Sequence, residues 1–189
     1  MKKLLPESGE EKKLIKKNLK NNRILNLLNC LLENPTKSMS KIAEKTGMHR
    51  RTAWEIQKNL EKENTIWGYT SVIDEQKINH VIYMLQFRTK PFSKDFAVLI
   101  LQRLTTGMPV KLGVRIIDIY FMHGEYDVFI KFSAPDHATA RNYCENLRSV
   151  YKDYFLETPQ VSDVNFSLVQ AGKLNPELKQ KIYDFVPIK

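Results

Sequence analysis

Disulfide frameworks, long apolar runs and secretion signals are all missing from this sequence of 189 residues. Its two cysteines, Cys30 and Cys144, each lie in an apolar helical pattern, so we expect two reduced packing residues. No run approaches the ~18 uninterrupted apolar residues of a membrane-spanning helix. The opening MKKLLPESGEEKK is basic but lacks the apolar core of a secretory signal. We therefore expect a cytoplasmic protein with no membrane partner.

The motifs of catalytic and metal-binding proteins are also missing. The histidines at positions 49, 80, 123 and 137 are scattered and lack the spacing of zinc ligands. No glycine-rich phosphate loop and no nucleophile motif appear. We therefore expect no metal, no cofactor and no catalytic residue, and hence a protein that is not an enzyme.

Acidic residues are fewer than basic ones: the sequence has 21 Asp and Glu residues against 30 Lys and Arg residues, which gives a net charge of +9. Residues 1–74 hold 15 basic and 9 acidic side chains, a net charge of +6. Residues 75–189 hold 15 and 12, a net charge of +3. The basic excess is concentrated in the N-terminal part, which indicates a polyanionic partner there.

Residues 1–21 form a lysine-rich segment with lysines at helical spacing: Lys12, Lys13, Lys16, Lys17 and Lys20. Two interpretations remain open. The segment is a solvated, partly frayed arm, or it is an arm that binds phosphates.

The segment 22–68 begins with two helical patterns. Apolar residues at three- and four-residue steps predict a first helix that ends before Pro35. Ser38 is a suitable N-cap for a short second helix, and Gly47 stands at the C′ position that favours glycine.

A third helix is expected almost immediately, over 50–63, with Asn64 where a left-handed C′ residue is needed. Residues 65–74, TIWGYTSVID, then have the pattern of a strand. A helix, a short helix, a tight turn, a helix and a strand in this order predict a helix-turn-helix with a wing-like strand.

Beyond Asp74 the sequence becomes rich in strands. The expected elements are a strand at 80–90, a helix at 92–107, two strands at 114–124 and 126–134 joined at Gly124-Glu125, a helix at 135–155 capped by Asp136, and a strand at 161–170. The order β-α-β-β-α-β predicts a ferredoxin-like domain, so the fold class is α+β. The helices cover one face of such a sheet, and the other face is usually hidden by a partner. A final helix is expected near Pro176.

Four short motifs carry a family resemblance: IAEKTGM at 42–48, LEKENTI at 60–66, GYTSVID at 68–74 and GEYD at 124–127. Together with the order of elements, they resemble the Lrp/AsnC (leucine-responsive, or feast/famine) family of transcriptional regulators. The resemblance covers 22–170. It implies DNA binding by the N-terminal domain and a homodimer through the C-terminal sheets, often assembled into tetramers or octamers. It also implies a small effector, commonly an amino acid, near GEYD.

The sequence departs from the family pattern at two places in or beside the third helix, over 50–63, which is the predicted recognition helix. His49 stands where the family usually has serine, and Ile56-Gln57 stands where it commonly has arginine followed by isoleucine. The groove-docking mode is unaffected, but the bases that are read remain open.

One face of the recognition helix is expected to pack through Ala53, Ile56 and Leu60 against Leu28, Ile42 and Ile66. The predicted DNA-contacting residues are His49, Arg50, Arg51, Thr52, Trp54, Glu55, Lys58 and Lys62. Arginine can donate two hydrogen bonds to guanine, while lysine, threonine and helix N-terminal amides bind phosphates. Basic residues at a helix N-terminus oppose the helix dipole, which favours a DNA role for Arg50 and Arg51.

Trp54 and the hairpin residues at 124, 126 and 127 each have two interpretations. Trp54 either contacts a sugar or thymine methyl, or covers the edge of the domain, and Tyr69 and Thr70 are assigned to the strand that docks onto it. Gly124, Tyr126 and Asp127 are the predicted effector-binding residues, with Asp127 meeting an ammonium group. The alternative for these hairpin residues is pairing across a dimer interface.

The predicted function is a sequence-specific, homo-oligomeric regulator of transcription, DNA-associated in the cytoplasm and modulated by a small effector. The predicted boundaries are a basic arm at 1–21, the helix-turn-helix at 22–68, a linker strand at 69–79, the ferredoxin-like sensing domain at 80–172 and a C-terminal helix and tail at 173–189. One alternative is an architectural DNA-binding protein with little sequence preference. The other is an enzyme of the same fold that resembles siroheme decarboxylases. The segment IYFMHGEYDVFIKF has the form found in the regulators, which argues against the enzyme, although His123 lies beside the turn.

Overall fold

The chain divides into two compact units, residues 1–71 and residues 72–189. The computed structural model describes residues 9–186, with side chains from Lys20 onward apart from that of Met108. Within this described part, no helix is both long enough and apolar enough to cross a membrane.

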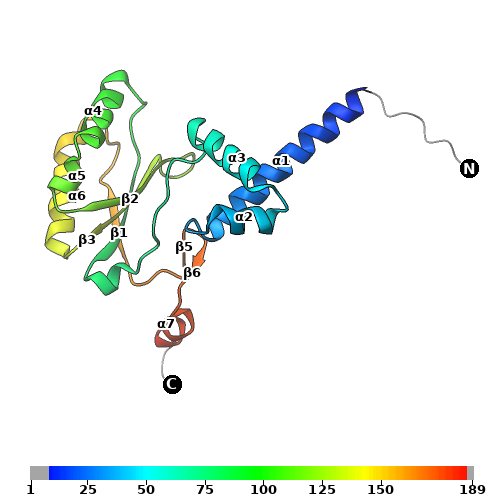
Figure 1. Ribbon diagram of the computed structural model, residues 1–189. Helices are drawn as coiled ribbons and strands as arrows, with labels where there is room; N and C mark the ends of the chain where they lie inside the picture. Colours follow the sequence, from blue (N-terminus) through cyan, green and yellow to red (C-terminus); the bar gives the residue numbers. More distant parts are fainter. Residues whose placement is uncertain (1–8, 187–189) are drawn as a thin grey trace, which may run out of the picture. The chain divides into compact units, whose positions relative to one another are not determined.

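The described part of the N-terminal unit contains three helices (Figure 1). They are α1 (Gly9–Glu33), α2 (Met39–Thr46) and α3 (Arg50–Lys62). Their buried core is made of Leu27, Cys30, Leu31, Ile42, Ala43, Ala53 and Leu60. The predicted contacts of Leu28, Ile56 and Ile66 are confirmed, because all three pack against this core. Helix α3 is therefore held by one apolar face, as its periodicity predicted.

Local capping sets the turn between α2 and α3. The Ser38 hydroxyl accepts a hydrogen bond from the Lys41 backbone amide at 3.4 Å, which confirms Ser38 as the N-cap. Gly47 has φ +63° and Asn64 has φ +56°, so both predicted left-handed positions are confirmed. A side chain at position 47 would be strained, and glycine there allows α2 and α3 to be separated by only three residues.

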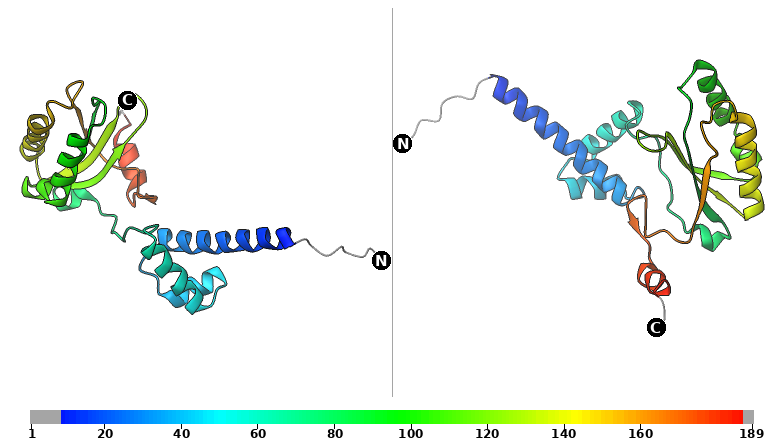
Figure 2. Two further views of the ribbon diagram at one scale, coloured as in Figure 1. Left: turned by 90° about the horizontal axis from the view of Figure 1, so that it is seen from above. Right: turned by 180° about the vertical axis from the view of Figure 1, so that it is seen from behind.

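Helix α1 begins much earlier than the sequence pattern predicted. It starts at Gly9 and is continuous through the segment assigned to a basic arm, while residues 1–8 of that arm lie outside the described residues. In both views of Figure 2 it extends past α2 and α3. Lysine, glutamate and leucine are good helix formers, so residues 9–21 continue the helix instead of forming a frayed arm.

The C-terminal unit is built on a four-stranded antiparallel sheet in the order β2-β3-β1-β4. Its elements are η1 (Glu75–Ile78), β1 (Val81–Phe87), α4 (Lys94–Thr105), α5 (Met108–Lys111), β2 (Arg115–Phe121), β3 (Val128–Ala134), α6 (His137–Tyr151), β4 (Gln160–Val164), β5 (Val169–Gln170), β6 (Lys173–Leu174) and α7 (Leu178–Asp184). This strand order and the β-α-β-β-α-β succession confirm the ferredoxin-like fold. The Asp136 carboxylate accepts from the Thr139 amide at 2.7 Å, which confirms the N-cap of α6.

Helices α4 and α6 lie on the same face of this sheet (Figure 1). Phe132 is fully buried at the centre of the core. Its ring stacks on Tyr83 with centroids 5.3 Å apart and meets Tyr143 edge-on at 4.8 Å. On the other face, Tyr120 and Phe129 stack across β2 and β3 at 6.1 Å, and Tyr120 is half exposed. The sheet therefore has one packed face and one partly open face.

The predicted strand at 65–74 is wrong for this chain. None of the described residues pairs with that segment, and it lies in no helix or strand after the turn that ends α3. A strand needs a neighbour to satisfy its backbone amides and carbonyls, and residues 9–186 supply no such neighbour to this segment.

The end of the chain is more finely divided than predicted. The strand expected at 161–170 splits into β4 and β5, and β5 pairs with β6 in a small hairpin. Helix α7 begins at Leu178, two residues beyond Pro176.

Candidate nucleic-acid interface

Helix α3 presents the predicted DNA-contacting residues away from the apolar core. Ala53 and Leu60 are buried, and Ile56 is partly buried against the same core. The exposed residues of the predicted set are His49, Arg50, Arg51, Trp54, Glu55, Lys58 and Lys62, and Thr52 is half-buried. Residues 51, 55, 58 and 62 follow each other at three- and four-residue steps, so they form one stripe along the helix.

Two basic residues of this stripe are paired with carboxylates on the same helix. Arg51 Nε lies 2.9 Å from Glu55 Oε1, and the Arg51 side chain is 89% exposed. Lys58 Nζ lies 2.6 Å from Glu61 Oε2. No ion pair among the described residues involves Arg50 or Lys62. The stripe therefore holds one cation without an ion pair, Lys62, beside two that can exchange an intrahelical carboxylate for DNA, and Arg50 adds a further cation at the helix start.

The start of α3 lacks a side-chain cap. His49 occupies the N-cap position, and its side chain makes no cap hydrogen bond. The first-turn amides of a helix have no partner within the helix, and they bind phosphate oxygens well. Arg50 and Arg51 stand beside these amides, so the helix start is chemically suited to a DNA backbone.

Trp54 and Ile56 have different surroundings on α3. Trp54 is 52% exposed, so half of its surface is available for contact with another molecule. Ile56 stands where the resembled family commonly has arginine, and it packs against the core. That position therefore offers no hydrogen-bond donor to DNA.

A hydrogen-bond network that the sequence did not reveal ties Tyr69 to α3. Gln57 Nε2 donates to Tyr69 Oη at 2.8 Å and to Glu61 Oε1 at 3.0 Å, and Tyr69 Oη donates to the same Glu61 oxygen at 3.0 Å. Hydrogen bonds from Lys58, Gln57 and Tyr69 lower the pKa of the Glu61 carboxyl below its ordinary value. Tyr69 thus docks onto the helix through its hydroxyl and not through a strand.

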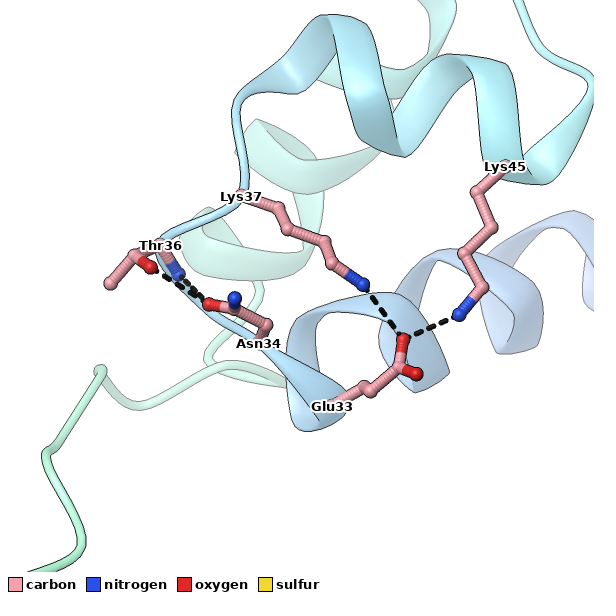
Figure 3. A network of polar contacts seen from close by, with 5 residues as sticks. All are labelled: Glu33, Asn34, Thr36, Lys37 and Lys45. Carbon is pink, nitrogen blue, oxygen red and sulfur yellow. Dashed lines mark hydrogen bonds and ion pairs between the residues drawn. The ribbon is translucent and has the colours of Figure 1, made fainter.

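Helices α1 and α2 are joined by a second polar network (Figure 3). Glu33 Oε2 lies 2.5 Å from Lys45 Nζ and 2.9 Å from Lys37 Nζ. The hydrogen bonds from Lys45 and then Lys37 lower the pKa of the Glu33 carboxyl from 4.5 to about 2. In the turn between α1 and α2, Asn34 Oδ1 accepts hydrogen bonds from the Thr36 amide and from the Thr36 hydroxyl.

We expect Glu33→Gln to remove a pH-dependent part of the stability of the helix-turn-helix. Because the folded pKa of Glu33 is depressed, its contribution is present above about pH 4.5 and is lost as the pH falls towards 2. Urea unfolding of both proteins across this range should show a difference that shrinks with falling pH. Glu44→Gln, the same chemical change at an exposed residue of α2, is the matched control. A constant difference for Glu33→Gln would contradict the assignment.

The predicted effector residues lie on the β2–β3 hairpin of the C-terminal unit. Gly124 has φ +155° in the turn. Asp127 Oδ2 accepts a hydrogen bond from the Thr89 backbone amide at 2.7 Å, so part of this carboxylate orders the chain after β1. Tyr126 Oη donates to Gln160 Oε1 on β4 at 2.9 Å. Both side chains thus already have partners within the unit.

The N-terminal part matches a known sequence family. Residues 20–66 match the family described as winged helix-turn-helix DNA-binding, which covers all of α2 and α3. No curated protein is significantly similar to the whole chain.

Several solved structures share the fold of both units. An AsnC family transcriptional regulator from Agrobacterium tumefaciens is 18% identical, with a TM-score of 0.60, over 81% of this chain and 95% of that one. AsnC from E. coli is 15% identical, with a TM-score of 0.57, over 79% and 94% of the two chains. A transcriptional regulator from Neisseria meningitidis, solved as an L-Met complex, is 14% identical, with a TM-score of 0.57, over 84% and 97%.

Structural similarity at identities this low shows a shared fold alone, and this fold is the architecture that the resemblance of the four sequence motifs implied. The family match independently covers α3, the helix that carries the basic stripe. The N-terminal domain is therefore similar to the winged helix-turn-helix DNA-binding family, and the chain shares the two-domain fold of solved AsnC/Lrp transcriptional regulators.

Proposed function

We propose that this protein is a sequence-specific transcriptional regulator that places α3 in the major groove of DNA. The observation that carries the proposal is the exposed stripe with Arg51, Lys58 and Lys62 on the third helix of a domain that matches a DNA-binding family. An α-helix fits the major groove, where arginine distinguishes guanine by two acceptors and lysine contacts phosphates. In this proposal the domain at 22–68 binds DNA, and the domain at 80–172 binds the effector and forms the oligomer.

A homo-oligomer is part of the proposal. The sheet face opposite α4 and α6 carries the stacked pair Tyr120 and Phe129, of which Tyr120 is half exposed, and a partly open aromatic face of this kind is suited to burial against a second copy. A dimer would present two α3 helices to two half-sites about one helical turn apart. Regulators bind palindromic operators in this way.

We further propose that a small effector such as an amino acid modulates the protein at the β2–β3 hairpin. The Neisseria relative of the same fold was solved with L-Met, and Asp127 offers a carboxylate to an ammonium group. With Oδ2 held by the Thr89 amide, a ligand would approach the other carboxylate oxygen. The Tyr126 ring would form a wall of the site.

We expect Asp127→Asn to weaken binding of methionine or leucine by roughly 10-fold or more, because a charge-assisted hydrogen bond becomes a neutral one. The asparagine oxygen can still accept from the Thr89 amide, so the melting temperature should stay unchanged. Calorimetry with each amino acid measures the affinity, with Asp163→Asn on exposed β4 as the matched control. Undiminished affinity in Asp127→Asn would remove the hairpin from the proposal.

The experiment that tests the function is competition between the DNA upstream of the protein's own gene and scrambled DNA of equal length. A preference of ~10³ or more for the upstream DNA is expected for a specific regulator. One observation favours a second candidate function, a low-specificity architectural protein: Ile56 packs inward and contributes no base contact. Equal binding to both DNAs would support that candidate and contradict the first.

A further inference from the structure

Helix α1 is much longer than its share of the three-helix core requires. Its residues in that core all lie in its C-terminal part: Leu27, Cys30 and Leu31, with Ile24 and Leu28 packed against them. The part that precedes them begins at Gly9 and extends past α2 and α3 in both views of Figure 2. This extension therefore offers a surface that the core does not use.

The extension is basic along most of its length. Residues 12–23 hold six Lys and Arg residues and no Asp or Glu. Lys20 and Arg23 are exposed, and no ion pair among the described side chains involves either of them. No acidic residue stands three or four positions from them, the spacings at which a helix pairs opposite charges. Their positive charge therefore has no partner on the helix.

Four of these cations share one side of α1. They form what we call the basic face, and they follow each other at three- and four-residue steps: Lys13, Lys16, Lys20 and Arg23. The next steps along the helix reach Leu27 and Cys30, which are buried in the core shared with α2 and α3. The basic face therefore continues, towards the N-terminus, the side of α1 that packs against these two helices. The opposite side holds only asparagine and leucine, at positions 18, 22, 25, 29 and 32.

Gathering the cations on one side has a local cost. Like charges three or four positions apart on a helix repel each other, and Lys12 and Lys13 near the start of α1 also oppose the helix dipole. A bound polyanion relieves both effects, because it places negative charge beside the cations. Residues 12–23 span about 17 Å of helix, which corresponds to roughly half a turn of duplex DNA.

We propose that the basic face of α1 binds the phosphate backbone of duplex DNA that flanks the site contacted by α3. The face belongs to the same compact unit as α3 and continues the side of α1 on which α3 packs, so docking of α3 brings DNA to this side. Lysine contacts phosphates as a flexible point charge and carries no sequence information. The contact therefore adds affinity for flanking DNA of any sequence and leaves recognition to α3. This inference rests on the proposed function, because α3 has to place the unit on DNA.

Binding of the full chain to two duplexes across a salt series tests the proposal. The short duplex is the shortest upstream DNA for which the parent protein keeps its preference over scrambled DNA. The long duplex adds about one helical turn, ~10 bp, at each end. Each phosphate contact contributes ~0.9 to the slope of log K against log salt, so the parent's slope should be steeper on the long duplex by about 3 for each bound copy.

A variant that moves two cations across the helix separates the basic face from net charge. It combines Lys16→Asn and Lys20→Asn with Asn18→Lys and Asn22→Lys, so its composition and net charge are those of the parent. Its slope on the long duplex should be lower than the parent's by about 2, and its slope on the short duplex should equal the parent's. Circular dichroism checks that both proteins have the same helix content. If the variant does not fold, the two duplexes decide with the parent protein alone.

Equal slopes of the parent protein on the two duplexes would overturn the proposal. So would a parental slope of the charge-relocated variant on the long duplex, because net charge alone would then explain the binding. A slope that is lowered equally on both duplexes would contradict a contact with flanking DNA. Failure of the proposed function is distinguishable from these results, because the parent protein would then bind neither duplex.

Discussion

Replacing Leu27 with alanine should destabilise the helix-turn-helix by about 2.7–5 kcal/mol, the range for fully buried leucines. Leu27 is 0% exposed at the centre of the cluster shared by α1, α2 and α3. Small units have little stability to spare, so this loss would leave much of the unit unfolded. DNA binding should fall with the folded fraction.

Leu25→Ala provides the matched control for this prediction. It is the same chemical change on the same helix, at a side chain that is 55% exposed, and should alter stability by about 0.5 kcal/mol or less. Hydrogen exchange measured segment by segment separates the two units. Faster exchange is expected in α2 and α3 of Leu27→Ala, with α6 of the C-terminal unit unchanged. Equal effects of Leu25→Ala and Leu27→Ala would contradict the assigned core.

Replacing Arg51 with alanine should weaken binding to the specific DNA site by about 1–3 kcal/mol, the value of one bidentate arginine–guanine contact. Binding to scrambled DNA should change much less, because phosphate contacts supply that affinity. Arg51 can reach a base because its side chain is 89% exposed and is held only by Glu55 on its own helix. Fluorescence anisotropy with both DNAs measures the two losses.

Arg141→Ala controls for the helix ion pair that Arg51→Ala also removes. Arg141 Nε lies 3.1 Å from Glu145 Oε1 at the same four-residue spacing, on α6, and its side chain is 80% exposed. This variant should bind both DNAs like the parent protein. A loss in Arg51→Ala that is equal on specific and scrambled DNA would instead identify Arg51 as a phosphate contact.

Elements bounded by local chemistry could be predicted from the sequence. Ser38, Gly47, Asn64 and Asp136 act on backbone groups within a few residues of themselves, so a short window of sequence contains the cause of each helix boundary. The basic stripe of α3 follows equally from periodicity, because burying Ala53 and Leu60 necessarily exposes the opposite face.

Features that depend on distant partners could not be predicted in this way. The segment 65–74 has the composition of a strand, yet whether it forms one depends on whether another strand lies beside it. The β5–β6 turn places Ala171 at φ +46° before Gly172, whereas asparagine or glycine usually signals such a position. The ion pair of Glu75 with Arg115 joins residues 40 positions apart, and Glu75 otherwise reads as an ordinary acidic residue in a first turn.

The salt dependence of DNA binding tests most directly the central claim that α3 docks on DNA through its basic residues. For the parent protein, log K should fall linearly with log salt, with a slope of about 0.9 for each phosphate neutralised. Lys62→Ala, which removes an exposed cation at the end of the stripe, should reduce that slope by about one. A binding constant that does not change with salt, or no binding to duplex DNA at about 50 mM salt, would contradict the claim.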